Sequence, residues 1–166
     1  VTATGSGAAN LKDGPVAVAR LNAERAAKLD ALRNILETLE GVQIDGKRSV
    51  GDMMSNGTIK TRVQGLARGF KVVDTRYYSD GSVDVVVQMP IDDNLTSALN
   101  VAPAKKAKAS TSGKKSFTGL VVNAKGLGVL PSIAPQVLDE KGKATYGAEF
   151  VTEGGMKDGG IANYVS

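Results

Sequence analysis

One segment of this chain constrains its fold more than any other: residues 15–40 predict a single long helix. Apolar residues recur there at intervals of three and four, the spacing that places side chains on one face of a helix. Pro15 suits the first turn because its missing N–H would have no partner there, and Gly41 supplies a stop. We expect the apolar stripe to comprise Val18, Leu21, Ala26, Leu29, Leu32, Ile35, Leu36 and Leu39.

The rest of this predicted helix is charged. Such a face is normally turned to solvent or to a neighbouring subunit, while the stripe packs on a sheet or a second helix. We therefore name Arg20, Arg25 and Arg33 as candidate contacts in an assembly.

Three shorter elements follow before residue 91. Residues 42–50 predict a short interrupted strand, and residues 58–68 a second helix, with Ser55 and Asn56 as candidate caps and Gly69 at its end. Residues 72–78 and 83–89 are rich in β-branched and aromatic residues and flank Asp80-Gly81, which predicts a hairpin. The expected fold class is α+β: a long and a short helix packed on an antiparallel sheet, with a C-terminal β extension.

The pattern changes beyond this part of the chain. We expect a compact α/β domain at residues 1–91, a lysine-rich linker or loop at 92–116 and a β-rich extension at 117–166. Within the extension, residues 117–124 predict a strand, and residues 136–138 and 144–146 a pair of strands around a turn. Because the first of these follows a long connection, it could add to the sheet edge of another subunit. Phe117, Leu120 and Val122 are its candidate contacts.

The positive charge of the chain lies in one segment. The formal net charge is +4, and the predicted linker holds five lysines without an acidic residue between residues 104 and 116: Lys105, Lys106, Lys108, Lys114 and Lys115. The remaining residues are therefore close to neutral. No aromatic residue that could stack on bases lies among these lysines, and no Arg that could read guanine. We expect no nucleic-acid partner, and we keep binding of an anionic polymer or membrane surface by these lysines as an alternative function.

The composition argues against catalysis, because the 166 residues include no His and no Cys. These absences exclude Ser-His-Asp relays, thiolate nucleophiles and the usual zinc sites. Residues 41–47 match the spacing of a phosphate-binding loop, but Arg48 stands where Ser or Thr would bind magnesium, and a predicted helix precedes the loop instead of a strand. We expect a non-enzymatic chain without a cofactor or metal. The glycine pair Gly5-Ser-Gly7 is better explained by close backbone packing or a turn than by nucleotide binding.

The order of several motifs carries a resemblance to a known family. These are Ala3-Thr4-Gly5-Ser6-Gly7, the helical segment from Arg20 to Ala31, Ile44, the short helix ending near Gly69, and the hairpin up to Val87. Together, over residues 1–91, they resemble a bacterial outer-membrane lipoprotein family that includes the flagellar basal-disk protein FlgP and the N-terminal domain of the flagellar ring protein FlgT. The segment from Thr118 to Leu127, with the prolines, glycines and Tyr146 that follow, resembles C-terminal extensions of such domains.

The resemblance implies a non-enzymatic structural protein that self-assembles into a ring, disk or filament in the periplasm, at the outer membrane or on the cell surface. The implied partners are further copies of the chain and other envelope or flagellar proteins. Membrane association would come only through an anchor that this sequence does not show. The family offers no catalytic residues to carry over.

Overall fold

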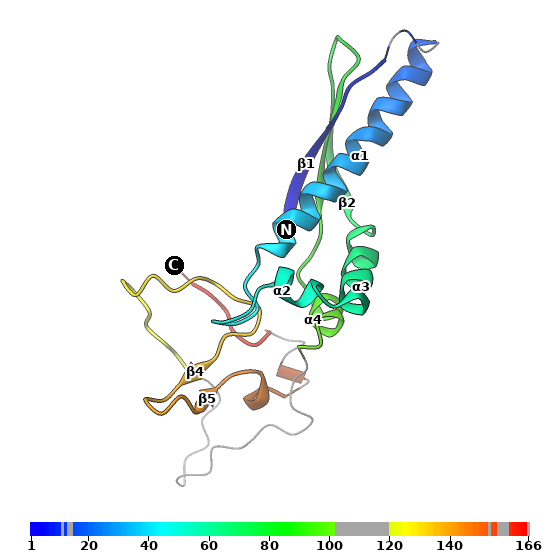
Figure 1. Ribbon diagram of the computed structural model, residues 1–166. Helices are drawn as coiled ribbons and strands as arrows, with labels where there is room; N and C mark the ends of the chain where they lie inside the picture. The colour runs from blue at the N-terminus through cyan, green and yellow to red at the C-terminus, as the bar shows by residue number, and fades with distance from the viewer. Residues whose placement is uncertain (11, 13–14, 102–119, 153, 156–159, 166) are drawn as a thin grey trace. The chain divides into compact units, whose positions relative to one another are not determined.

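The computed structural model describes residues 1–10, 12, 15–101, 120–152, 154–155 and 160–165. The chain divides into a first unit, Val1–Val42 with Ser49–Asn100, and a second unit, residues 43–48 with 101–166. The first unit contains β1 (Thr2–Gly7), α1 (Val16–Glu40), α2 (Val50–Met54), α3 (Gly57–Ala67), β2 (Lys71–Tyr77), β3 (Val83–Gln88) and α4 (Asp93–Ala98). The second contains β4 (Val137–Leu138), β5 (Ala144–Tyr146) and the short 3-10 helix η1 (Ala148–Phe150). The predicted α+β class is confirmed (Figure 1).

The first unit is built on a three-stranded antiparallel sheet in the order β1-β3-β2. β2 and β3 form the predicted hairpin, and Gly81 in its turn has a φ of 85°, a conformation that glycine adopts without strain. Alternate residues of β3 are fully buried, namely Val83, Val85 and Val87. The other face of the sheet carries polar residues such as Thr4, Ser6 and Asp84 and is open to solvent. One face therefore belongs to the core.

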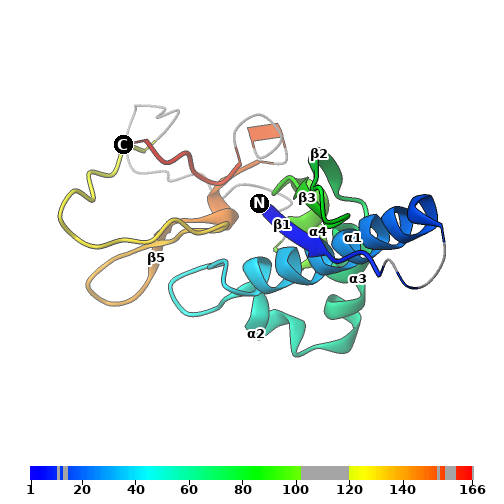
Figure 2. The same cartoon turned by 90° about the horizontal axis from the view of Figure 1, so that it is seen from above.

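Helix α1 packs on the buried face, mainly against β1 and β3 (Figures 1 and 2). Gly5 and Gly7 lie on that face because they pair with Val85 and Val83. A Cβ atom at either glycine would meet the backbone of α1 more closely than real Cβ atoms approach a neighbour. The glycine pair is therefore explained by close packing, one of the two readings that the sequence left open, and it lies in a strand that the sequence did not predict.

The buried side of α1 differs from the predicted stripe. It consists of every fourth residue along the helix: Ala19, Ala23, Ala27, Ala31, Ile35 and Leu39. Only Ile35 and Leu39 belong to the predicted set, while Val18, Leu21 and Leu29 are exposed. The prediction was wrong here because the glycines of β1 bring the helix so close that only alanine fits between them.

The remaining helices close one end of this core. α3 and its cap Asn56 confirm the predicted second helix; the Asn56 side chain accepts hydrogen bonds from the backbone N–H groups of Thr58 and Ile59. The interrupted strand predicted at residues 42–50 does not form: Gln43 makes an isolated bridge with Ser132, and Ser49 and Asp52 form a capping box that starts α2. Asp92 likewise caps α4, whose Leu95 is fully buried, so the first unit extends past residue 91 into the region predicted as a linker.

The second unit has little regular structure. β4 and β5 confirm the predicted strand pair, joined by a turn in which the Asp139 carboxylate accepts hydrogen bonds from the backbone of Lys141 and Lys143. Residues 43–48 belong to this unit because the backbone N–H groups of Ile133 and Ala134 donate to the carbonyls of Gln43 and Ile44. The strand predicted at residues 117–124 is wrong for the described residues 120–124, which pair with no strand and end at a turn containing Gly126. Residues 117–119 lie outside the described part.

Candidate interaction surface

One side of α1 is free of packing along its whole length. It lies opposite the alanine stripe and consists of the row Ala17, Leu21, Arg25, Leu29, Arg33 and Glu37, all of them exposed; we call it the outer row. Leu21 is 55% exposed and Leu29 is 70% exposed. Since no other described element of the first unit covers these leucines, the outer row is an apolar and charged surface of that unit.

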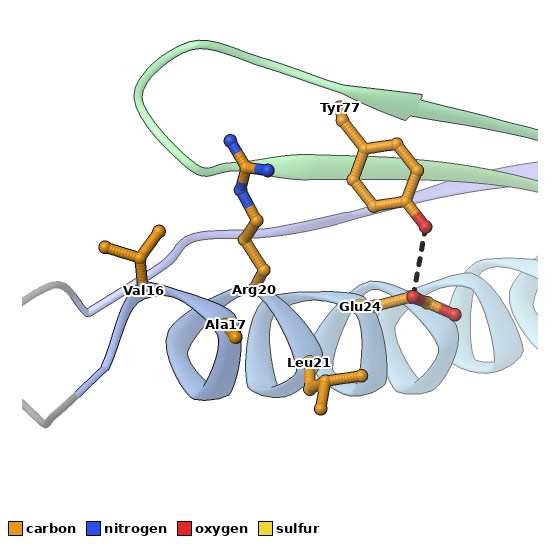
Figure 3. Close-up of a pocket in the computed structure, with 6 residues that line it drawn as sticks. All are labelled: Val16, Ala17, Arg20, Leu21, Glu24 and Tyr77. Atoms are coloured by element: carbon orange, nitrogen blue, oxygen red, sulfur yellow. Dashed lines mark hydrogen bonds between the residues drawn. The ribbon is translucent and has the colours of Figure 1, made fainter.

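The predicted contacts Arg20, Arg25 and Arg33 all lie on the exposed part of α1, but they do not form one cluster. Arg25 and Arg33 belong to the outer row, whereas Arg20 lies on the flank toward β2 (Figure 3). Arg33 is 2.6 Å from the Asp30 carboxylate and 3.8 Å from that of Glu37. Among the described residues, Arg20 and Arg25 form no ion pair. Their charges are therefore not neutralised by neighbours in the described fold.

A shallow hollow of about 550 Å³ lies between the first half of α1 and β2. It is lined by Val16, Ala17, Arg20, Leu21, Glu24 and Tyr77. In Figure 3, Arg20 and Tyr77 stand between the helix and the hairpin, whereas Leu21 points away from the hairpin. The hollow exists because α1 covers β1 and β3 but leaves the Tyr77 face of β2 largely bare; the Tyr77 side chain is 58% exposed.

One hydrogen bond links the two walls of this hollow, and a second, within α1, shares its acceptor. The Tyr77 hydroxyl donates to the Glu24 carboxylate over 3.1 Å, and the Lys28 ammonium donates to the same carboxylate over 2.6 Å. These bonds, with that of Lys28 contributing most, lower the pKa of Glu24, and the bond to Glu24 raises the pKa of Tyr77. Among the described residues that line the hollow, Arg20 is the remaining charged side chain, so the arrangement fixes charges of both signs on this surface.

The two edge strands, β1 and β2, oppose the addition of another strand in different ways. On β1, the Ser6 N–H donates to Asp30 over 3.0 Å and the Thr4 carbonyl accepts from Asn34 over 2.8 Å, so side chains of α1 occupy that edge. On β2, the register shifts between Val72 and Asp74. Bulges and edge charges are devices that oppose strand addition. Side chains of α1 are therefore better placed than backbone pairing to make contacts with a partner.

The predicted contacts in the C-terminal part are found only in part. Leu120 and Val122 are both more than half exposed, and Val121 between them is 96% exposed. They make an apolar segment without a strand partner among the described residues. Phe117 lies outside the described residues, as do the five lysines Lys105, Lys106, Lys108, Lys114 and Lys115, so their role stays a prediction.

Among the described residues of the second unit, the acidic side chain of Asp45 is buried. Its Oδ2 atom accepts two hydrogen bonds from the Arg48 guanidinium, at 2.9 and 2.6 Å, and its Oδ1 atom accepts from the backbone N–H groups of Lys47 and Arg48. Burial raises the pKa of Asp45, but these bonds and the charge of Arg48 together hold it below its ordinary value. Residues 41–47, which match the spacing of a phosphate-binding loop, thus use their N–H groups to bind the Asp45 carboxylate of the same loop. Helix α1 precedes this loop, as the sequence predicted.

Asp45→Asn is expected to destabilise the second unit by about 1–3 kcal/mol, because the amide cannot replace a carboxylate that is hydrogen-bonded to a guanidinium. Since folding lowers the pKa of Asp45, its contribution is complete above the ordinary value of 3.8 and is lost as the pH falls through the lower folded value. Urea unfolding followed by Tyr146 and Tyr164 fluorescence, in a background with Tyr77 and Tyr78 changed to Phe, measures this. Glu140→Gln, at an exposed acidic residue of the same unit, is the control; an equal loss there would contradict the assignment.

The described residues form neither a cluster of metal ligands nor a membrane-spanning helix. Among them, no three acidic side chains gather closely enough to hold a metal ion. None of the helices in the described part is long and apolar enough to cross a bilayer.

Comparison with known proteins gives one similarity. Residues 119–166 match the family model described as the second domain of Treponema pallidum Tp0624. The matched residues all belong to the second unit and make up less than a third of the chain. No curated protein and no solved structure matches significantly.

Proposed function

We propose that this chain is a non-enzymatic structural protein of the bacterial cell envelope that assembles with further copies of itself. The single observation that carries the proposal is the outer row of α1, whose leucines are exposed and whose arginines include one without an ion pair among the described residues. Complete burial of a leucine side chain contributes about 1.5–3 kcal/mol. A partner that covers Leu21 and Leu29 would gain this energy, whereas an isolated chain leaves it unused.

Further features support an assembly. The apolar segment around Val121 and the Tyr77 face of β2 are further exposed surfaces. The envelope location, in the periplasm, at the outer membrane or on the surface, rests on the resemblance of residues 1–91 to the lipoprotein family with flagellar members. The match of the tail to a domain of a Treponema pallidum protein supports a bacterial origin of that part. A ring, disk or filament is the proposed product, with other envelope or flagellar proteins as further partners.

Association through the outer row predicts a melting temperature that depends on protein concentration, because a partner that binds only the folded state stabilises it by mass action. We expect the wild-type chain to melt at a higher temperature as its concentration rises. The variant Leu21→Asp/Leu29→Asp should melt at one temperature throughout, close to that of the dilute wild type. Differential scanning calorimetry over a hundredfold range of concentration measures both; a wild-type transition that does not move would count against the proposal.

A further inference from the structure

The charges of α1 are arranged against the dipole of the helix. Residues 16–28 contain three cations and one anion, a net charge of +2, and residues 29–40 contain one cation and three anions, a net charge of −2. The first turn has no acidic residue and the last turn no basic one. A helix dipole favours the reverse arrangement, with anions near the N-terminus and cations near the C-terminus. The pattern therefore does not serve the stability of the isolated helix.

Several of these charges have no strong partner in the described part of the chain. Arg20 and Arg25 form no ion pair there, and neither does Glu40. Glu37 meets only Arg33, at 3.8 Å and with both side chains 68% exposed. Unpaired cations thus lie in the first half of α1 and weakly paired anions in the second.

We propose that α1 packs against α1 of a second copy in antiparallel orientation, with the outer rows in contact. This inference rests on the proposed self-assembly and adds its geometry. Antiparallel pairing places the positive half of one helix beside the negative half of the other, and it opposes the two dipoles. Arg20 and Arg25 of one copy face Glu40 and Glu37 of the other, which sets the two-fold axis beside residues 30 and 31, between Leu29 and Arg33 in the outer row. Leu29 is the most exposed leucine of the helix and lies within two residues of this axis. Parallel pairing would instead bring like charges together.

Charge reversal tests the orientation. Sedimentation equilibrium should show that Arg20→Glu/Arg25→Glu and Glu37→Lys/Glu40→Lys each raise the dissociation constant at least about tenfold, since the two-fold axis doubles every altered contact. The quadruple variant should associate within about threefold of the wild type, because all four pairs are restored with opposite sign. In Glu37→Lys/Glu40→Lys, cations in the last turn suit the helix dipole and offset the loss of the weak, exposed Arg33–Glu37 contact, so its dissociated monomer should melt close to the wild-type temperature. Loss of association in this variant cannot then be attributed to a weakened fold.

Single cysteines give a second readout, because the chain has none of its own. Leu29→Cys lies near the axis and should form a disulfide-linked dimer under mild oxidation. Ala17→Cys, near the helix start, should not form a disulfide, because Cys at the same position of the second copy would lie at the far end of the paired helices. If the wild type associates but Ala17→Cys links efficiently, or the charge reversals leave the dissociation constant unchanged, the antiparallel contact is wrong while self-assembly stands. If the wild type stays monomeric, the proposed function fails and this inference with it.

Discussion

Gly5→Val/Gly7→Val is expected to unfold the first unit. Both glycines lie in β1 where α1 crosses it, and a side chain at either position would strike the backbone of the helix. Overpacking typically costs about 1–3 kcal/mol per site and more where the surroundings cannot yield. The two changes together therefore approach the whole stability of a small domain, about 5–15 kcal/mol. Valine has a higher strand propensity than glycine, so the change in propensity alone would stabilise β1. A loss of stability must therefore come from the steric clash with α1.

Circular dichroism during urea unfolding measures this effect, and Gly65 provides a matched control. Gly65 lies within α3, and nothing stands within 4 Å of the position that a Cβ atom would take. Gly65→Ala should therefore stabilise the protein by about 0.5–1 kcal/mol, the usual gain for alanine in a helix. A Gly5→Val/Gly7→Val variant as stable as the wild type would show that α1 does not pack on β1 as described.

The second large effect separates the two possible buried sides of α1. Ala27 is fully buried between the helix and the sheet, so Ala27→Leu should destabilise the first unit by about 3 kcal/mol. Leu29 belongs to the stripe predicted from the sequence but is 70% exposed, so Leu29→Ala should change the stability of the monomer by no more than about 0.5 kcal/mol. Both values are measured by urea unfolding of dilute protein, where association contributes nothing. A loss of 2–5 kcal/mol for Leu29→Ala, as for a core leucine, would mean that the predicted stripe is the buried one.

The elements that the sequence predicted well are those with strong local signals. Pro15 and Gly41 mark the ends of α1, Asn56 caps α3, and Asp80-Gly81 forms the hairpin turn. Each of these residues acts on its own neighbours in the chain. Local chemistry was therefore enough to place α1, α3, β2 and β3.

The features that the sequence analysis missed depend on contacts between distant residues. Nothing local distinguishes the glycine pair of β1 from a turn, since the reason for Gly5 and Gly7 is the backbone of α1 more than fifteen residues away. Hydrophobic periodicity also assigned the leucines and not the alanines of α1 to the buried stripe. Periodicity depends on apolar character and takes no account of the narrow space between α1 and β1. Helices α2 and α4 are too short to show a hydrophobic period, and the caps Ser49 and Asp92 are their only local sequence signals.

The candidate surface was predicted in outline only. The charged face of the helix was expected to meet solvent or a subunit, and the structure places Arg20, Arg25 and Arg33 on exposed positions. The leucines of the outer row could not be foreseen, because the same periodicity assigned them to the core. The division of charge along α1 is visible in the sequence. It indicates pairing with a second copy only once the structure shows that the outer row is exposed.

The molar mass of the wild-type chain in solution tests the central claim most directly. Light scattering coupled to size-exclusion chromatography should give a multiple of 17.1 kDa at high protein concentration, falling toward 17.1 kDa on dilution. A mass of 17.1 kDa at every concentration up to the limit of solubility would contradict the assignment of α1 as a contact between copies.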